Sequence, residues 1–376
     1  MNLPVFEKIY ITQASESSEV AKRIINLYPS EIIKFVHDES EVPLATERGR
    51  ISAEDFNSSK KQLLLTTFKG QFFKRCPGAT QKKTLTCCNY HVLNLGSQCN
   101  MNCSYCYLQS YLNSPITKIF TNIEQALIEL ETMASEHPDQ PFRVGTGEVM
   151  DSLSLDELTL YSIKLIEFFK KYPKWILEFK TKSDKIDQFI EHEHAGNIVV
   201  SWSINPQYVI SKEEHGTASI KQRLNAAKKC LDTGFKIAFH IDPMIWHPEW
   251  KENYSELVHQ VTAAFGPKDV FNVSLGTLRF QPEQRHIMRE RFGLDSLVTT
   301  AEMFPSEGAK LRYDAGVRAE MFQFVRSEFL KNSQEWSIFL CMETPETWIK
   351  TFEKVPMQLN DLKPVFKQLP EISKIF

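Results

Sequence analysis

The sequence predicts an α/β protein, with a partial (βα)6 barrel of the TIM type, an α/β segment before it and a mostly helical extension after it. Three observations support this fold class. After residue 90, six short β-rich runs alternate with longer amphipathic patterns, as in parallel βαβ units. The chain has 376 residues, 42% of them hydrophobic, which allows two or three domains with a substantial core. No segment approaches the roughly 18–20 apolar residues needed to span a bilayer, so we expect no membrane association.

The predicted barrel strands form a regular series. They occupy residues 90–96, 142–147, 176–181, 198–205, 235–242 and 270–275. The helices between them carry apolar residues at three- and four-residue steps, for example Ile123, Ala126 and Leu130. Because such units place their active-site groups at the carboxyl ends of the strands, we expect the functional residues there.

The flanking regions do not share this rhythm. Shorter elements are predicted there, with strands at 9–11, 32–36 and 336–341 and helices at 20–27, 285–292 and 319–330. We therefore expect three parts: an N-terminal α/β domain (1–85), the barrel (86–282) and a C-terminal region (283–376) that caps the barrel and contacts the substrate.

The net charge and the cysteine content limit the classes of function that the protein can have. The 44 Lys and Arg residues against 47 Asp and Glu give a net charge of −3, which argues against a protein that binds polyanions over its whole surface. The first residues, MNLPVFEKIYITQ, lack the pattern of a secretory signal, so we expect a cytoplasmic protein. In a reducing compartment, the 8 cysteines favour metal binding or catalysis over disulfides.

Three of these cysteines form a compact motif directly after the first predicted barrel strand. Cys99, Cys103 and Cys106 lie within eight residues. Three thiolates on one loop can hold a 4Fe–4S cluster and leave the fourth iron free to bind the amine and carboxylate of a small molecule. The alternative is a zinc site, which needs a fourth ligand such as Cys76, Cys87 or Cys88.

The cysteine motif and its surroundings resemble a known family. The run LGSQCNMNCSYCYLQ resembles the radical S-adenosylmethionine (SAM) superfamily and, within it, the spore photoproduct lyase family of DNA repair enzymes. The resemblance covers about residues 86–320 and continues through FKTKSDKID, SWSINPQYVI, GTASIKQRLNAAKK, PMIWHPEW and KLRYDAG. It implies a radical SAM barrel that repairs a methylene-bridged thymine dimer in UV-damaged DNA.

The resemblance also implies the cofactors and their ligands. Cys99, Cys103 and Cys106 would hold the 4Fe–4S cluster. Reductive cleavage of SAM at its open iron would give a 5′-deoxyadenosyl radical, which removes hydrogen from C6 of the dihydrothymine half. The predicted SAM-binding residues are Tyr105 near the adenine, Lys182 at the carboxylate, Ser203, and the pair Gly147 and Glu148, whose carboxylate would accept hydrogen bonds from the SAM ammonium group.

One position departs from the family. The lyase returns hydrogen to the product radical from a cysteine, where this chain has Thr146. Threonine cannot replace a thiol, because its O–H and C–H bonds are much stronger than S–H. Three explanations remain open. The donor is Tyr107; or it is a thiol, either Cys341 or one of Cys76, Cys87 and Cys88; or the substrate is another DNA lesion, an RNA or a small molecule.

Basic residues suggest a nucleic-acid surface. By the resemblance, Arg312 and Tyr313 lie on a hairpin that wedges into damaged DNA. Residues 60–83 combine Lys and Arg with Phe68, Phe72 and Phe73 and contain no acidic residue, a pattern typical of strand binding. A second basic group comprises Arg279, Arg285, Arg289 and Arg291. The expected partners are DNA and a reduced flavodoxin or ferredoxin-type electron donor; a zinc-stabilised nucleic-acid-binding barrel without catalysis is the alternative from another class.

Overall fold

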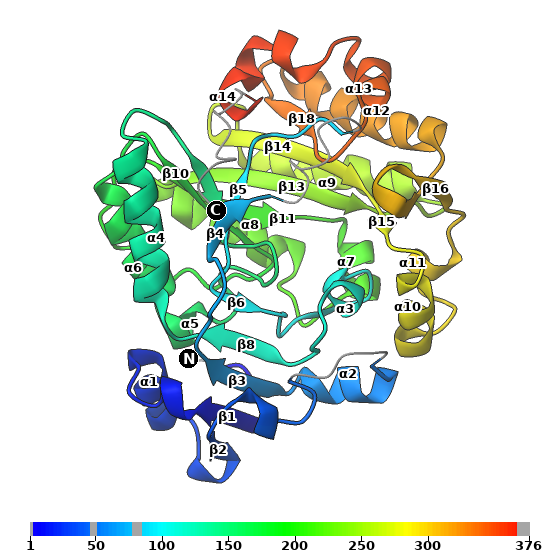
Figure 1. Cartoon of the computed structure of the whole chain (residues 1–376). Coiled ribbons are helices and arrows are strands. Elements are labelled where there is room, and N and C mark those ends of the chain that lie inside the picture. Colours follow the sequence, from blue (N-terminus) through cyan, green and yellow to red (C-terminus); the bar gives the residue numbers. More distant parts are fainter. Residues whose placement is uncertain (1–2, 46–50, 77–84, 367–376) are drawn as a thin grey trace.

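The structure is a computed structural model that describes residues 3–45, 51–76 and 85–366. Within these residues, the larger sheet has eight strands in the order β18-β14-β13-β11-β10-β9-β5-β4, curled into a partial barrel (Figure 1). Their bounds are β4 Phe73–Arg75, β5 His91–Leu93, β9 Arg143–Gly145, β10 Ile176–Thr181, β11 Ile198–Ser203, β13 Lys236–Met244, β14 Val270–Thr277 and β18 Ile338–Leu340. All neighbouring strands are parallel except β4 and β5. The predicted α/β partial barrel is confirmed.

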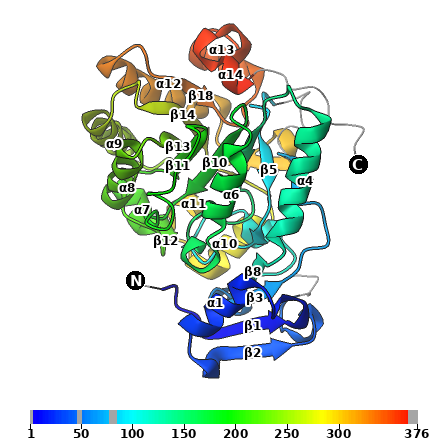
Figure 2. The same cartoon turned by 90° about the vertical axis from the view of Figure 1, so that its left-hand side faces the viewer.

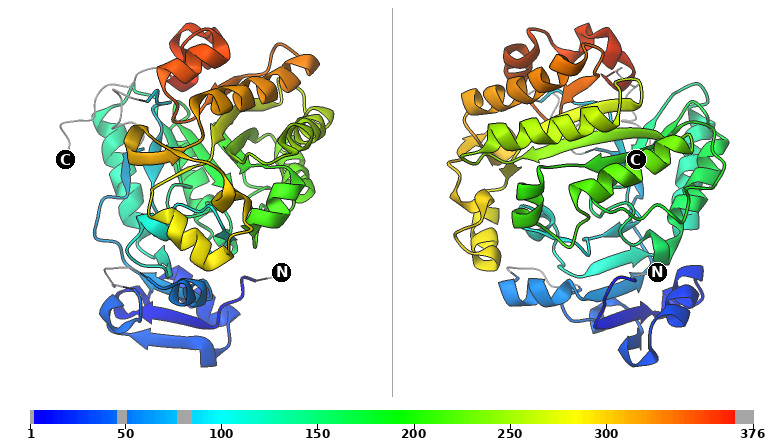
Figure 3. Two further views of the ribbon diagram at one scale, coloured as in Figure 1. Left: turned by 90° about the vertical axis from the view of Figure 1, so that its right-hand side faces the viewer. Right: turned by 180° about the vertical axis from the view of Figure 1, so that it is seen from behind.

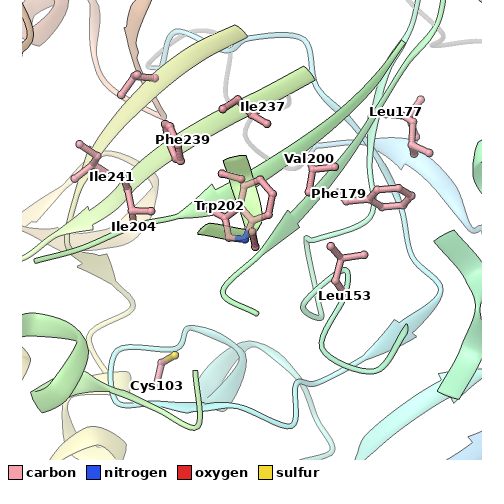
Figure 4. Packing of buried hydrophobic residues seen from close by; sticks show 14 of the residues in the cluster. Cys103, Leu153, Leu177, Phe179, Val200, Trp202, Ile204, Ile237, Phe239 and Ile241 are labelled. Carbon is pink, nitrogen blue, oxygen red and sulfur yellow. The ribbon is translucent and has the colours of Figure 1, made fainter. Parts of the chain in front are cut away.

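Helices cover the outer face of this sheet (Figures 1 and 3). They are α4 Ile123–Glu136, α6 Tyr161–Lys170, α7 Gln207–Glu213, α8 Ile220–Asp232, α9 Trp250–Ala264 and α12 Ala315–Asn332, with the short α5 Asp156–Thr159. Side chains alternate along each strand, so buried residues such as Phe179, Val200 and Phe239 share one face. Figure 4 shows these residues within the apolar packing, with Cys103 on a separate loop. The other strand face is left for polar side chains.

The N-terminal part forms a second sheet beneath the barrel (Figure 2). Its order is β2-β1-β3-β8-β6, and its elements are β1 Lys8–Thr12, β2 Ile33–Val36, β3 Gln62–Thr66, β6 Gly96–Ser97 and β8 Thr117–Phe120, with helices α1 Glu19–Leu27 and α2 Ala53–Ser59. The predicted strands at 9–11 and 32–36 and the helix at 20–27 are present. Two strands of this sheet, β6 and β8, come from beyond residue 85. They belong to the sheet because β8 pairs with β3 and β6 pairs with β8.

The C-terminal part is mostly helical, as predicted, and in Figure 1 it extends from the right-hand side of the barrel to its top. It contains α10 Gln284–Phe292, α11 Leu297–Thr300, α12, α13 Pro345–Phe352, α14 Lys363–Phe366 and the small sheet β15 Arg279–Phe280, β17 Lys310–Arg312 and β16 Phe304–Ser306. The late strand expected at 336–341 is β18, which joins the barrel beside β14. None of the helices described here has the length and apolarity required to cross a bilayer.

A seam joins the two ends of the curled sheet. The segment before β5 meets the segment after β18, where the Thr86 N–H donates to the Glu343 carbonyl at 2.9 Å. Asn89 Nδ2 also donates to the Phe366 carbonyl at 3.2 Å. These contacts bring the start of the barrel and the C-terminal region together, although hundreds of residues separate them in the sequence.

Candidate functional site

The three-cysteine loop is held from several sides at the carboxyl ends of the barrel strands. Its short strand β7 Asn102–Cys103 pairs with β12 Glu214–His215, and the Ser104 N–H donates to the Glu213 carbonyl at 2.9 Å. Lys60 Nζ donates to the Cys99 carbonyl at 2.6 Å. Gln284 Nε2, from α10, reaches the carbonyls of Tyr105 and Cys106 at 3.0 and 3.2 Å. All three parts of the chain therefore fix this loop.

The donor set of the loop fits an iron–sulfur cluster. Burial raises the pKa of Cys99 to about 11 and that of Cys103 further, while the cations of Lys60 and Lys182 act in the opposite direction. Across the described segments, no three His, Cys, Asp or Glu side chains are spaced for a single metal ion. The three thiolates that hold a cubane cluster bind three different irons, so they lie further apart than the ligands of a single ion. The three thiols of this loop interact with one another and have cations nearby, an arrangement that suits such a cluster.

The predicted SAM contacts Tyr105, Lys182 and Ser203 lie together beside this loop. Lys182 Nζ lies 5.7 Å from the centre of the Tyr105 ring. Burial disfavours the charge of Lys182, but Glu214 and Cys103 outweigh that effect and raise the pKa of its ammonium group. Ser203 ends β11, where its hydroxyl donates to the Asp242 carbonyl at 3.4 Å. The structure thus brings an aromatic ring, a cation and a hydroxyl to one side of the loop.

Gly147 and Glu148 follow β9 on the neighbouring strand. A Cβ atom at Gly147 would lie 3.0 Å from the Cβ and the carbonyl oxygen of Lys180, so a larger residue would disturb the backbone there. The Glu148 carboxylate is 3.6 Å from Lys74 Nζ and accepts a hydrogen bond from Asn94 Nδ2 at 3.2 Å. These contacts leave the carboxylate able to accept further hydrogen bonds at the barrel rim.

The two predicted hydrogen donors occupy different places. The Tyr107 ring is 40% exposed at the rim, and its hydroxyl donates to the Glu148 carbonyl. Cys341 directly follows β18, and its N–H donates to the Leu275 carbonyl at 2.8 Å. Strand alternation places Cys341 on the same face of β18 as Phe339, which pairs with Ser274. The Ser274 hydroxyl contacts His240 in the barrel interior, so Cys341 faces the same interior.

Four cysteines outside the loop gather at the seam. Cys87 and Cys88 hydrogen-bond to each other, and this bond lowers the pKa of Cys87. Cys76 and Cys341 lie near enough to raise the pKa of Cys87 in opposition to that bond. Burial and Asp242 raise the pKa of Cys341 to about 12. The residues considered as a fourth zinc ligand therefore lie with Cys341 at the seam.

Thr146 does not share this environment. Its hydroxyl donates to Ser152 Oγ at 2.8 Å, and it lines a small cavity with Leu95, Met150 and Phe179. Phe179 lies on the apolar face of β10, so Thr146 points to the outer side of the strands. The chain has no cysteine between Cys106 and Cys230, so no residue near Thr146 in the sequence offers a thiol in its place.

Charged side chains form a layer inside the barrel. Glu178 accepts from Arg143 Nη2 at 2.8 Å and lies 2.8 Å from His240 Nε2. Burial lowers the pKa of His240 to about 4, although the hydrogen bond to Glu178 opposes this shift. The ion pair and the neutral imidazole are joined by hydrogen bonds through Glu178 and are buried from solvent, which gives the interior a rigid polar surface.

This layer predicts acid sensitivity. An unfolded histidine titrates near pH 6.5, so between pH 6.5 and 4 the unfolded state binds more protons at His240 than the folded state does. The free energy of unfolding should therefore fall as pH decreases through this window, with His240 contributing up to about 3 kcal/mol. Urea unfolding of His240→Asn should show a shallower pH dependence. Exposed His259→Asn is the control and should keep the wild-type dependence; an unchanged slope in His240→Asn would contradict the assignment.

Comparison with known proteins identifies the family. The family model described as spore photoproduct lyase matches residues 5–307. This chain belongs to the spore photoproduct lyase family. Among curated relatives, the spore photoproduct lyase of Bacillus subtilis (strain 168) is 30% identical over 181 residues, which cover 48% of this chain and 53% of the relative. That of Geobacillus sp. (strain Y412MC61) is 27% identical over 205 residues, covering 54% and 60%. These alignments thus span a little over half of each relative.

Solved structures of spore photoproduct lyases share the fold. A mutant with bound AdoMet and dinucleoside spore photoproduct has a TM-score of 0.77 at 21% identity, covering 91% of this chain and 100% of that chain. A lyase complexed with dinucleoside spore photoproduct has a TM-score of 0.76 at 21% identity, covering 90% and 99%. The family match ends at residue 307, so Arg312, Tyr313 and Cys341 lie beyond it.

The structure places both residues of the predicted DNA wedge in buried contacts. Arg312 is 1% exposed and Tyr313 is 3% exposed. Arg312 pairs with buried Glu343 at 3.2 Å, and the Tyr313 hydroxyl accepts from the Trp246 N–H at 3.1 Å. Both side chains therefore attach the hairpin to the barrel, because each finds a buried partner, and neither is displayed to a duplex in this structure.

The structure also corrects the expected basic surface at residues 60–83. Phe72 and Phe73 are in the core, Lys60 holds the cysteine loop, and Lys82 and Lys83 lie outside the described residues. In the second group, Arg279 forms two hydrogen bonds with Asp242, at 2.9 and 3.0 Å. Lys60 and Arg279 are thus used inside the molecule, whereas Lys61, Lys69 and Arg289 are exposed.

Several site residues were not anticipated from the sequence. Glu213, Glu214 and Arg223 are almost completely buried behind the cysteine loop, and Lys60 reaches it from the N-terminal part. The only signal for Arg223 was its place within the matched run GTASIKQRLNAAKK. Isolated charged residues have no local signature, because their burial depends on partners from distant segments.

Proposed function

We propose that this chain is a radical SAM lyase that repairs spore photoproduct, the methylene-bridged thymine dimer of UV-damaged DNA. The observation that carries the proposal is the three-cysteine loop, fixed at the carboxyl ends of the barrel strands beside a polar interior. Family membership supports it, as do the relatives named spore photoproduct lyase. Repair of another lesion, an RNA or a small molecule has no comparable support.

The cofactor contacts follow from this proposal. Cys99, Cys103 and Cys106 would hold the 4Fe–4S cluster. When bound, the cluster and SAM together supply a one-electron cleavage that gives a carbon-centred radical, so the protein has to orient the reactants and exclude competing reactions. The residues proposed to bind SAM are Tyr105, Gly147, Glu148, Lys182 and Ser203. Lys182 would pair with the carboxylate and Glu148 would accept from the ammonium group.

The partners and the division of the chain are part of the proposal. We assign residues 86–282 to the cofactors, 1–85 to support of the cysteine loop, and 283–376 to closure of the barrel over the substrate. A reduced flavodoxin or ferredoxin-type protein would supply the electron. The cytoplasm is the compartment whose thiol pools would keep all these cysteines reduced.

Hydrogen return is assigned to Cys341, with Tyr107 as the second candidate. Cys341 faces the barrel interior, and its thiol S–H bond is weak enough to give a hydrogen atom to a carbon radical. The Tyr107 hydroxyl instead donates to the Glu148 carbonyl at the rim. In this step the S–H bond of Cys341 would break and a C–H bond of thymine would form. The thiyl radical would then take back a hydrogen atom from the methyl group of 5′-deoxyadenosine, and the adenosyl group would rejoin methionine as SAM.

Solvent deuterium distinguishes the two donors. Thiol and phenol hydrogens exchange in D2O, so thymine made by the wild type should contain deuterium. Cys341→Ala should lose this label, because the exchangeable donor is gone, while Tyr107→Phe should retain it. Mass spectrometry of the product reads the outcome, and the reverse pattern would overturn the assignment to Cys341.

Lesion specificity tests the proposed substrate. Reduced, iron-loaded protein with SAM is incubated with two oligonucleotides, one containing spore photoproduct and the other a cyclobutane thymine dimer. We expect thymine to be restored only in the first, because the methylene bridge is the bond that radical fragmentation breaks. Restoration in the second alone, or in neither while 5′-deoxyadenosine forms, would show that the substrate is different.

A further inference from the structure

A buried ion pair lies behind the cysteine loop. The Glu214 and Arg223 side chains are completely buried, and Arg223 Nη2 donates to Glu214 Oε2 at 2.6 Å. The guanidinium makes three further hydrogen bonds: Nε donates to the Ala218 carbonyl at 2.8 Å, Nη1 to the Ser203 carbonyl at 2.7 Å and Nη2 to Thr217 Oγ1 at 2.7 Å. Two opposite charges are therefore fixed out of contact with bulk solvent.

The carboxylate of this pair contacts the loop directly. Glu214 pairs with Cys103 across the β7–β12 ladder. Its Oε1 accepts from the Tyr105 hydroxyl and from Asn205 Nδ2, the latter at 2.9 Å. Asn205 Oδ1 in turn accepts from the Tyr254 hydroxyl at 3.0 Å. The carboxylate thus fixes the ring that lies between two cysteines of the motif.

The same charge acts on the cation beside the ring. Burial alone would lower the pKa of Lys182, yet Glu214 contributes the largest opposing effect. Burial likewise disfavours the charged form of Glu214, and Arg223 and Lys182 restore it. The Arg223 hydrogen bond to the Ser203 carbonyl extends the contact to a third proposed SAM residue.

The structure assigns Glu214 and Arg223 as positioning residues of the cofactor site. Glu214 orients Tyr105, whose ring lies 5.7 Å from Lys182 Nζ, and the opposed charges of Glu214 and Arg223 set the reduction potential of the bound cluster. This inference rests on the proposed function. Net charge near a cluster is one of the determinants of its potential, and these two buried charges lie beside the loop that would hold it, where water screens them little.

Opposite charge changes test the inference. The cluster is loaded anaerobically, and its midpoint potential is measured by electron paramagnetic resonance at a series of applied potentials. Glu214→Gln removes a negative charge and should shift the potential to a more positive value. Arg223→Met removes a positive charge and should shift it to a more negative value. Tyr105→Phe removes one hydrogen bond without changing charge and should leave the potential near that of the wild type.

The double variant keeps the test valid if a single variant fails to fold. Glu214→Gln/Arg223→Met removes both partners of the ion pair, so thermal unfolding should show a folded protein. Its potential should return to the wild-type value, whereas a merely structural role predicts that the double variant deviates most. Shifts of the same sign in both single variants, or no shift in either, would overturn the inference. Absence of a cluster in the wild type would instead overturn the proposed function itself and the inference with it.

Discussion

Cys103→Ala should take up no 4Fe–4S cluster and should not cleave SAM. Cys103 is buried between Cys99 and Cys106 in the loop and pairs through its backbone with β12. Without its thiolate, only two ligands remain, and a cubane with a single open iron cannot be held. The measurement is iron content after anaerobic reconstitution, where the wild type should bind about four irons per chain.

Cys230→Ala is the matched control for that experiment. Cys230 is fully buried on α8, away from the cysteine loop, and burial alone raises its pKa. Its replacement should leave iron content and the visible spectrum of the loaded protein unchanged. A wild-type spectrum in Cys103→Ala would contradict the cluster assignment, and loss of the cluster in both variants would point to misfolding.

Glu343→Ala should lower the free energy of unfolding by about 3–5 kcal/mol, because a buried charge pair that loses one partner leaves the other uncompensated. Glu343 is fully buried, 3.2 Å from Arg312 Nη1 and 3.4 Å from Arg318 Nε. Its carbonyl also accepts the Thr86 N–H at the seam of the barrel. Both the hairpin and the seam depend on this residue. Urea unfolding measures the effect.

Glu346→Ala is the control three residues further along. Glu346 is exposed and pairs with Lys350 one turn later at 2.7 Å, an arrangement that contributes little to stability in water. Its unfolding curve should overlie that of the wild type. If Glu343→Ala unfolds at the same urea concentration as Glu346→Ala, the Glu343 ion pairs do not hold the C-terminal region on the barrel.

The barrel was predictable because its strands are continuous apolar runs between helical patterns. The predicted strand at 176–181 coincides with β10, whose residues are almost all buried. The strands β3 and β8 were not predicted, because β3 pairs with β1 and β8 pairs with β3 across long stretches of sequence. The apolar run of β3 lies within a segment interpreted from its charges as a nucleic-acid surface.

The site was predictable where spacing carries the chemistry. The positions of Cys99, Cys103 and Cys106 in one loop follow from the sequence, and the structure gathers Tyr105 and Lys182 beside them. Single polar residues were not predictable in this way. Arg312 was expected to contact DNA, but buried Glu343 decides its place, and that partner comes from a segment outside the family match. Glu214 and Arg223 were not predicted either, because a single charged residue carries no local signal that it is buried.

The most direct test of the central claim follows one hydrogen atom. A dinucleotide spore photoproduct labelled with deuterium at C6 of the dihydrothymine half is given to the reduced, iron-loaded protein with SAM. The account predicts that deuterium appears in the adenosyl group, both in 5′-deoxyadenosine and in the SAM re-formed from it, while intact thymines are released. Unlabelled 5′-deoxyadenosine with the dinucleotide unchanged would contradict it.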